Sequence, residues 1–231
     1  MDTTVIIPAY NEEVGIGMTL SKIQQVLPAD SEIMVVDDGS VDKTCDIASG
    51  YSCIVIKHSI NRGKGEAIKT GISYARGDKV IWIDADDTYP AELIPEIILA
   101  LNSYDAVVCS RLYGRENIPA FNRVGNWIFK TMIQKIYGFA GQDVCSGLYG
   151  VKLKWLKMMN LKASKFSIEP EVSIKAARMK LKVLDIPITY NLRVGESNLN
   201  PIRVGFEDLF RILSLVFWRV KSSDEESDIE L

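Results

Sequence analysis

The stretch VIWIDADDTYP, residues 80–90, decides the fold class, because an apolar strand ends there in a cluster of acids. Its first four residues are β-branched or aromatic, which favours a buried β-strand. Asp84, Asp86 and Asp87 follow within four positions. In open α/β sheets ligands bind at the carboxyl ends of the strands, so acids at a strand end indicate a site. The stretch therefore predicts both a buried sheet and a functional edge.

The rest of the chain repeats this alternation of strand and helix. Short β-branched runs predict strands at residues 4–8, 32–36, 53–57, 79–83 and 105–110. The segments between them predict helices at residues 12–27, 41–49, 64–75 and 91–102, with Asn11 and Ser40 as N-caps. Such repeats join parallel strands by right-handed crossovers. The predicted fold class is α/β, with a mostly parallel central sheet and helices on both faces.

Acids follow three of the predicted strands, in the segments PAYNEE, DDGS and DADD. These ends should open on one crevice, where the acids would repel each other unless a cation lies among them. On an extended chain Asp84 and Asp86 project to the same side, about 6.5 Å apart. They can hold a divalent cation whose other ligands are phosphate oxygens and water. The competing interpretation is that these acids cap a helix or solvate a turn.

Composition narrows the class of protein. The chain has 231 residues, of which 47% are hydrophobic, enough for a substantial core. The formal net charge is −3, but without the five acids of the last ten residues 27 basic residues face 25 acidic ones. This balance does not favour a nucleic-acid partner. Four scattered cysteines and a single histidine argue against zinc and disulfides, and favour a reducing compartment.

The sequence also argues against a secreted or membrane-spanning chain. The N-terminus lacks the basic and apolar succession of a signal peptide. The longest uncharged apolar run near the C-terminus, ILSLVFW, is seven residues. A bilayer-spanning helix needs about 20. We therefore expect a cytoplasmic protein that does not cross a membrane by itself.

A glycine-rich stretch, NRGKGEAIKTG at residues 61–71, raises a competing function. A dinucleotide fingerprint would need glycine where Ile68 stands, and no GxxxxGK[ST] loop occurs. A Rossmann dehydrogenase and a P-loop hydrolase are therefore disfavoured. Gly63 and Gly65 fit either a phosphate-proximal loop or a simple turn into a helix.

Four segments in order, VIIPAYNEE, VVDDGSVDKT, NRGKGEAIKTGISYARGD and VIWIDADDTYP, closely resemble the family 2 glycosyltransferases of the GT-A fold. That resemblance runs from about Thr4 to about Ile97. The later segments DVCSGLYGVK and IEPEVSIKAARMKLKVLDIPITYNLRVGESNLNP are similar to the branch that transfers sugar to polyprenyl or dolichyl phosphate. The resemblance implies a UDP- or GDP-sugar donor and a metal ion, Mg²⁺ or Mn²⁺. It also implies inversion of configuration at the anomeric carbon of the sugar.

The resemblance also implies roles for particular residues. Metal binding falls to Asp84 and Asp86, since carboxylates suit these cations. Nucleotide-sugar binding falls to the residues that match the family's donor motifs: Pro8, Ala9, Tyr10, Glu12, Asp37, Asp38, Arg62, Lys64, Asp84, Ala85 and Asp86. The resemblance implies that the first acid of the pair Asp37 and Asp38 reads the base. We expect the catalytic residues to be Asp86, Arg123 and Asp143.

A phosphate acceptor is already anionic at neutral pH, so it needs positioning rather than a general base. The resemblance places its phosphate against Arg111, Arg123 and Arg193, in preference to Arg115. Asn198 replaces the lysine common in this branch. If the acceptor were a neutral hydroxyl, Asp143 would be the candidate base. Glu169 and Glu171 are interpreted only as acids that favour a helix start.

Two other functions remain open. One is a family 2 transferase acting on a glycan or protein hydroxyl. The other is a catalytically inert module that binds a nucleotide sugar. Conversion of Asp143 to Asn separates the first from phosphate-acceptor chemistry, because only a hydroxyl acceptor needs a base.

The predicted organisation is a catalytic domain over residues 1–200, an amphipathic helix over 201–221 and an acidic, disordered tail over 222–231. Apolar residues recur at helical spacing in the second part: Phe206, Leu209, Phe210, Leu213, Val216, Phe217 and Val220. Such a stripe fits a membrane interface, packing on the domain, or a homodimer equally well. A lipid-linked acceptor favours the membrane, so we expect peripheral association with its cytosolic face.

Overall fold

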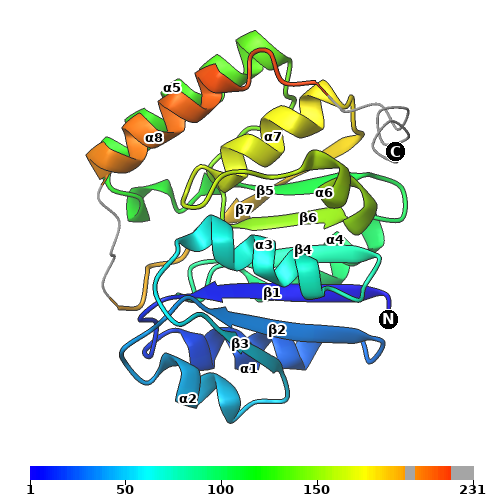
Figure 1. Ribbon diagram of the computed structural model, residues 1–231, viewed down its shortest axis with the longest axis vertical. Helices are drawn as coiled ribbons and strands as arrows, with labels where there is room; N and C mark the ends of the chain where they lie inside the picture. The colour runs from blue at the N-terminus through cyan, green and yellow to red at the C-terminus, as the bar shows by residue number, and fades with distance from the viewer. Residues whose placement is uncertain (196–200, 220–231) are drawn as a thin grey trace, which may run out of the picture.

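The computed structural model describes residues 1–195 and 201–219. Their core is a seven-stranded sheet in the order β3-β2-β1-β4-β6-β5-β7 (Figure 1). The strands are β1 Thr3–Ala9, β2 Ser31–Asp37, β3 Ile54–Lys57, β4 Lys79–Ile83, β5 Ala106–Tyr113, β6 Leu148–Lys152 and β7 Val183–Thr189. The five strands predicted from the sequence are therefore confirmed, to within a few residues at their ends.

The sheet is mostly parallel, as predicted. Strands β1 to β4 pair in parallel, and so do β5 and β7. Strand β6 is the exception, because it lies antiparallel to both β4 and β5. The carboxyl ends of β1, β2 and β4 consequently lie along one edge, to which the arrowhead of β1 points in Figure 1.

Helices cover both faces of the sheet. They are α1 Ile16–Val26, α2 Thr44–Ser49, α3 Lys64–Tyr74, α4 Ile94–Ala100, α5 Ala120–Tyr137, α6 Leu153–Met159, α7 Ile168–Arg178 and α8 Pro201–Ser214, with 3₁₀ turns η1 Ala91–Leu93 and η2 Arg115–Asn117. Side chains alternate along a strand, so Ile6 of β1 packs in one core with α3 and α7, while Val5 and Ile7 pack in the other with α1 and α4.

Two helix starts differ from the prediction. Helices expected from residues 12 and 41 begin instead at Ile16 and Thr44, and neither Asn11 nor Ser40 is an N-cap. Ser40 Oγ accepts a hydrogen bond from Asn11 N at 2.9 Å, and Asn11 Oδ1 accepts one from Val41 N at 3.0 Å. These side chains therefore tie together the loops after β1 and β2, at the edge where the acids gather.

Helix α8 both packs on the domain and exposes an apolar stripe. Asp208, Ile212 and Leu215 are buried against the rest of the protein. The stripe predicted from the sequence supplies the exposed Phe206, Phe210, Leu213 and Phe217. Helix α5 runs beside α8 (Figure 1). Asn198 and the predicted tail 222–231 lie outside the described residues. Within residues 1–195 and 201–219, no helix is long and apolar enough to cross a membrane.

Candidate active site

The three acid-bearing loops meet at the carboxyl edge of the sheet, but Asp84 and Asp86 are not on an extended chain. Strand β4 ends at Ile83, and the chain turns at once, with Asp87 in the left-handed region at φ 61°. The prediction that both aspartates project from a strand was therefore wrong in detail. They still share one site, since burial and the charge of Asp84 raise the pKa of Asp86 above its ordinary value.

Asp84 lies between a glycine and a lysine. Its Oδ1 is 2.7 Å from Lys64 Nζ, and Lys64 Nζ is also 2.6 Å from Glu169 Oε1. A Cβ added at Gly147 would lie 2.1 Å from Asp84 Oδ2, so a larger residue there would displace this carboxylate. Burial opposes the charge of Lys64, but Asp84 and Glu169 more than offset this and raise its pKa.

Asp86 is held on the other side of the site. Its Oδ1 accepts a hydrogen bond from Thr88 Oγ1 at 2.5 Å, and its Oδ2 accepts one from Arg193. The same guanidinium donates to Glu12. Burial, with the charges of Asp86 and Asp84, raises the pKa of Glu12 to about 7 despite this contact. Arg193, expected at the acceptor phosphate, thus contacts acids of the loops after β1 and β4.

These groups fit a cation only together with a diphosphate. Among the described residues, no group of three or more His, Cys, Asp or Glu side chains is arranged to hold a metal ion. Asp84 and Asp86 supply the carboxylate oxygens that Mg²⁺ and Mn²⁺ prefer. This donor set suits an ion whose remaining ligands are phosphate oxygens and water.

The end of β2 offers a buried acceptor for a nucleotide. Asp37 is fully buried, and its Oδ1 accepts a hydrogen bond from Ser40 N at 2.9 Å. Its Oδ2 is also buried and accepts no hydrogen bond from the described residues, although Lys57 Nζ lies 3.5 Å away. A buried oxygen in this state is suited to a donor on a ligand. Pro8, Ala9 and Tyr10 lie at the end of the neighbouring β1.

Asp38 has different hydrogen-bond partners from Asp37. It accepts hydrogen bonds from the backbone N–H groups of Arg62 and Gly63 and contacts His58 Nδ1 at 2.6 Å. The Arg62 side chain is exposed and pairs with Glu66 at 3.4 Å. Asp38 therefore orders the loop that leads to Lys64. His58 was missed by sequence reasoning, because its partner is twenty residues away.

On the far side of β4, Arg111 and Asp143 form a buried ion pair. Arg111 Nε lies 2.6 Å from Asp143 Oδ2, and its Nη2 donates to Asp143 Oδ1 at 3.0 Å and to Cys145 O at 2.8 Å. Its guanidinium also lies over the Tyr190 ring. Burial would raise the pKa of Asp143, but Arg111 holds it below its ordinary value. Asp143 therefore orients Arg111.

This pair forms one wall of a basic cavity of about 70 Å³. Arg123, from α5, lines the same cavity, so the structure brings together two of the three predicted acceptor arginines. The remaining lining residues are Leu112, Arg115, Ile118, Asn126, Trp127, Lys130 and Gln142. Asp143 offsets the charge of Arg111, but Arg115, Arg123 and Lys130 keep the lining basic, which favours an anion such as a phosphate monoester.

Glu169 is the main residue of this cluster to which sequence reasoning gave no role in the site. It lies in the first turn of α7, as expected, but its side chain is 3% exposed and points to Lys64. Acids are common in the first turn of a helix because they interact favourably with the helix dipole. Such a position therefore gives no sign in the sequence that the side chain also contacts a lysine from another helix.

The mostly parallel sheet is an α/β arrangement in which ligands bind at the carboxyl edge, where the acids lie. The described structure matches glucosyl-3-phosphoglycerate synthase from Mycobacterium tuberculosis, solved with Mn²⁺, UDP and glucosyl-3-phosphoglycerate. The TM-score is 0.73 over 96% of this chain and 81% of that one, at 20% identity. This likeness confirms the GT-A fold.

Residues 4–164 match the family described as glycosyl transferase family 2, and the chain belongs to that family. It is 30% identical to the dolichyl-phosphate hexose transferase of Haloferax volcanii, over 88% of this chain and 89% of that protein. It is 27% identical to the undecaprenyl-phosphate mannosyltransferase of Micrococcus luteus, over 89% and 90%. The protein is therefore a glycosyltransferase, as its motifs predicted.

Proposed function

We propose that the protein transfers a hexose from a UDP- or GDP-sugar to polyprenyl or dolichyl phosphate, with inversion and with Mg²⁺ or Mn²⁺. The observation that carries this proposal is the basic cavity formed by Arg111 and Arg123. Four of its lining residues, Arg123, Asn126, Trp127 and Lys130, come from helix α5, which also exposes Phe121, Val124 and Ile128. The charges of Arg111 and Asp84 both act on Tyr89, so the cavity and the acidic site are neighbours. An acceptor phosphate on a lipid chain needs a basic pocket for the phosphate and an apolar surface nearby for the lipid.

In this reaction the acceptor phosphate is the nucleophile, and the nucleoside diphosphate is the leaving group. Asp84 and Asp86 would hold the cation, which neutralises the departing diphosphate. Lys64 adds a fixed positive charge beside Asp84. Arg111 and Arg123 bind and orient the acceptor phosphate, and so offset its repulsion from the donor. Asp37, at the end of β2, accepts a hydrogen bond from the base.

Asp143 does not fit the role of a general base. Both of its oxygens are engaged, one by Arg111 Nε and the other by Arg111 Nη2 and Cys145 N. A phosphate acceptor needs no base, whereas a glycan or protein hydroxyl does. The pairing of Asp143 with Arg111 therefore favours the phosphate acceptor over the hydroxyl alternative. The inert binding module is disfavoured by the intact acids at residues 84 and 86.

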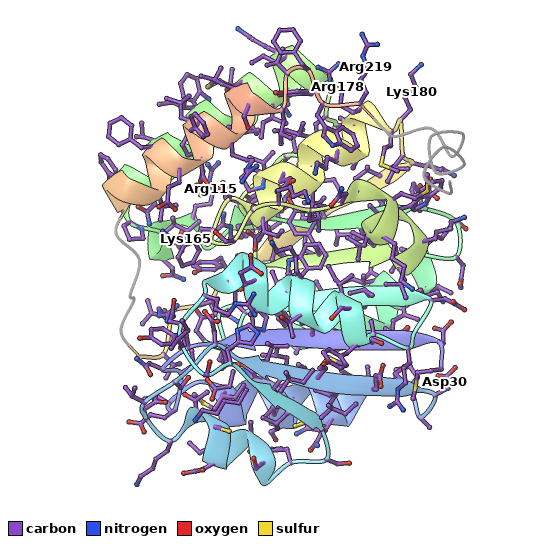
Figure 2. All side chains as sticks on the ribbon, in the orientation of Figure 1. Asp30, Arg115, Lys165, Arg178, Lys180 and Arg219 are labelled. Atoms are coloured by element: carbon purple, nitrogen blue, oxygen red, sulfur yellow. The ribbon has the colours of Figure 1, made fainter. Side chains whose placement is uncertain are left out.

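The apolar face of α5 and α8 is the proposed membrane contact, and we define it by its exposed residues. From α5 they are Phe121, Val124, Trp127 and Ile128, and from α8 and the residues after it Phe206, Phe210, Leu213 and Phe217. Aromatic side chains over two adjacent helices fit the boundary of a lipid headgroup layer. Arg178, Lys180 and Arg219 gather beside one end of these helices (Figure 2). Such cations attract anionic lipid.

This arrangement supports peripheral association with the cytosolic face of a membrane, through residues 201–221 and α5. The catalytic domain would then be residues 1–200. A second copy of the chain is the competing occupant of the same apolar face, in which case the protein would be a homodimer.

The test is a screen of UDP- and GDP-hexoses with polyprenyl phosphate in detergent micelles, scored by the mass of the lipid product. We expect a product in which one hexose is joined to the phosphate, and a requirement for Mg²⁺ or Mn²⁺. A polyprenol without phosphate serves as the matched control acceptor and should give no product. Product from the polyprenol alone would favour the hydroxyl alternative.

A further inference from the structure

Lys64 is shared between two carboxylates at the edge of the proposed metal site. Its Nζ lies 2.7 Å from Asp84 Oδ1 and 2.6 Å from Glu169 Oε1. All three side chains are largely or partly buried, with 13% of Lys64, 27% of Asp84 and 3% of Glu169 exposed. One ammonium cannot neutralise two carboxylates at once. Asp84 consequently keeps part of its negative charge.

The backbone around Lys64 is fixed against the segment that leads to α7. A Cβ at Gly63 would lie 2.5 Å from Ser164 O, and one at Gly65 would lie 2.5 Å from Ala163 O. Gly63 also has a φ of 99°, which favours glycine. Glu66 N donates to Ser164 O at 3.0 Å. The start of α3 and the approach to α7 are therefore one packed unit, which holds Lys64 within reach of Glu169.

The two acids in the first turn of α7 do different work. Glu171 accepts hydrogen bonds from the backbone N–H groups of Lys162 and Ala163 and pairs with Lys175 at 2.5 Å. Its contacts stay within the α6–α7 connection and α7 itself. Glu169 instead reaches out of the helix to a side chain from α3, which contacts the acid after β4. Glu169 is thus the link between α7 and the metal side of the site.

We propose that Glu169 is a positioning residue that sets the affinity of Asp84 for a divalent cation. By sharing the ammonium of Lys64, it leaves Asp84 negative enough to accept a metal ion while keeping Lys64 beside the diphosphate. Without Glu169, the ammonium pairs with Asp84 alone and competes with the ion. This inference rests on the proposed function in one respect, namely that Asp84 binds the metal.

The test measures binding of Mn²⁺ alone to the full chain, by the electron paramagnetic resonance signal of free Mn²⁺. We expect E169Q to weaken Mn²⁺ binding about tenfold, because the neutral side chain of this variant no longer competes with Asp84 for the ammonium of Lys64. The ammonium then pairs with Asp84 alone and opposes the binding of Mn²⁺. E169D keeps the charge but shortens the side chain, so Lys64 falls out of reach. It should also weaken binding, by at least about threefold.

Two further variants separate positioning from simple charge or misfolding. E207Q removes one negative charge from an acid on α8 that pairs with Lys165 at 2.9 Å, and should leave Mn²⁺ affinity unchanged. K64M removes the ammonium, so adding E169Q to K64M should weaken binding less than E169Q does alone. Melting temperatures, measured on every variant, show that each is folded. If E169Q does not fold, the E169D measurement stands in its place.

The outcomes are distinct. Equal Mn²⁺ affinity in the wild type and in E169Q overturns the inference, and so does an E169D affinity equal to that of the wild type. An undiminished E169Q effect in the K64M background also overturns it, because Glu169 would then act by charge alone. If the wild type itself binds no Mn²⁺ at millimolar concentration while still transferring sugar, the metal assignment of the proposed function fails instead.

Discussion

Arg193 donates hydrogen bonds to Glu12 and to Asp86, so a guanidinium lies between two acids of the proposed donor site. The loop that carries it is tied to the loop after β4, since Asn191 N donates to Thr88 O at 2.9 Å. Sequence reasoning placed Arg193 with the acceptor phosphate. In this state of the protein it lies instead where it would compete with a metal ion for Asp86.

The first prediction concerns this competition. R193A should bind Mn²⁺ alone more tightly than the wild type, by about three- to tenfold, because the carboxylate of Asp86 loses a positive neighbour. The same variant should form less lipid product, because a cation beside the diphosphate is lost. Mn²⁺ titration and product mass measure the two effects separately. The matched variant R193K keeps the positive charge, so its Mn²⁺ affinity and its yield of lipid product should lie between those of R193A and the wild type. Weaker Mn²⁺ binding by R193A than by the wild type would contradict the competition.

The second prediction concerns the acceptor side. D143N should retain measurable turnover with polyprenyl phosphate, with a rise in the KM for the acceptor, because Arg111 loses its orienting partner. It should also lower the melting temperature, since breaking a buried ion pair costs about 3–5 kcal/mol. Steady-state kinetics on folded protein separate kcat from KM. Loss of kcat at saturating acceptor, in a variant that is still folded, would point to a general base and a hydroxyl acceptor.

The third prediction concerns the apolar face of α5 and α8. Replacing Trp127, Phe210 and Phe217 together by serine should lower binding to vesicles that contain anionic lipid by tenfold or more, because each aromatic buries apolar surface in the headgroup layer. Vesicle sedimentation measures this. V41S, an exposed apolar residue remote from both helices, is the matched control and should bind as the wild type does. If the triple variant binds vesicles normally but turns a dimer into a monomer, the face is a homodimer interface.

The fourth prediction is a pH dependence of the attachment of α8. Burial, with the charges of Glu169 and Glu207, raises the pKa of Asp208 from 3.8 to about 7, although Ser167 donates to it. A carboxyl whose pKa is raised on folding stabilises the fold below its unfolded pKa. That contribution is lost as the pH rises from about 4 to about 7.

D208N cannot ionise, so it should remove this loss. Its melting temperature should exceed that of the wild type at about pH 8, by the equivalent of about 1–3 kcal/mol. Thermal melting across that pH range measures the difference. E92Q, at an exposed acid that is not among the groups acting on Asp208, is the control. Parallel pH profiles in D208N and the wild type would contradict the assignment to Asp208.

Much of the fold could be predicted from the sequence, because short β-branched runs and strand-end acids are local signals. The N-caps could not, because Asn11 and Ser40 contact each other across two loops rather than the helices that follow them. The antiparallel β6 depends on the path of the chain after α5, which no local pattern encodes.

The candidate site divides in the same way. The acids at residues 84 and 86 were visible, because a strand that ends in charge is an unusual local pattern. The contacts of Lys64 with Glu169 and of Arg193 with Asp86 were not visible, since each joins residues about one hundred positions apart. The carboxylate partners of Lys64 and Arg193 can be identified only in the folded structure, because the sequence does not show which acids lie next to them.

The central claim is that Asp84 and Asp86 bind a divalent cation together with the diphosphate of a sugar donor. The most direct measurement is a crystal structure with Mn²⁺ and UDP or GDP, with Mn²⁺ located by its anomalous scattering. We predict Mn²⁺ between these carboxylates and the diphosphate, with Arg193 moved away from Asp86. A nucleotide bound elsewhere, or an Asp86 that keeps Arg193 and no Mn²⁺ at saturating concentration, would contradict the account.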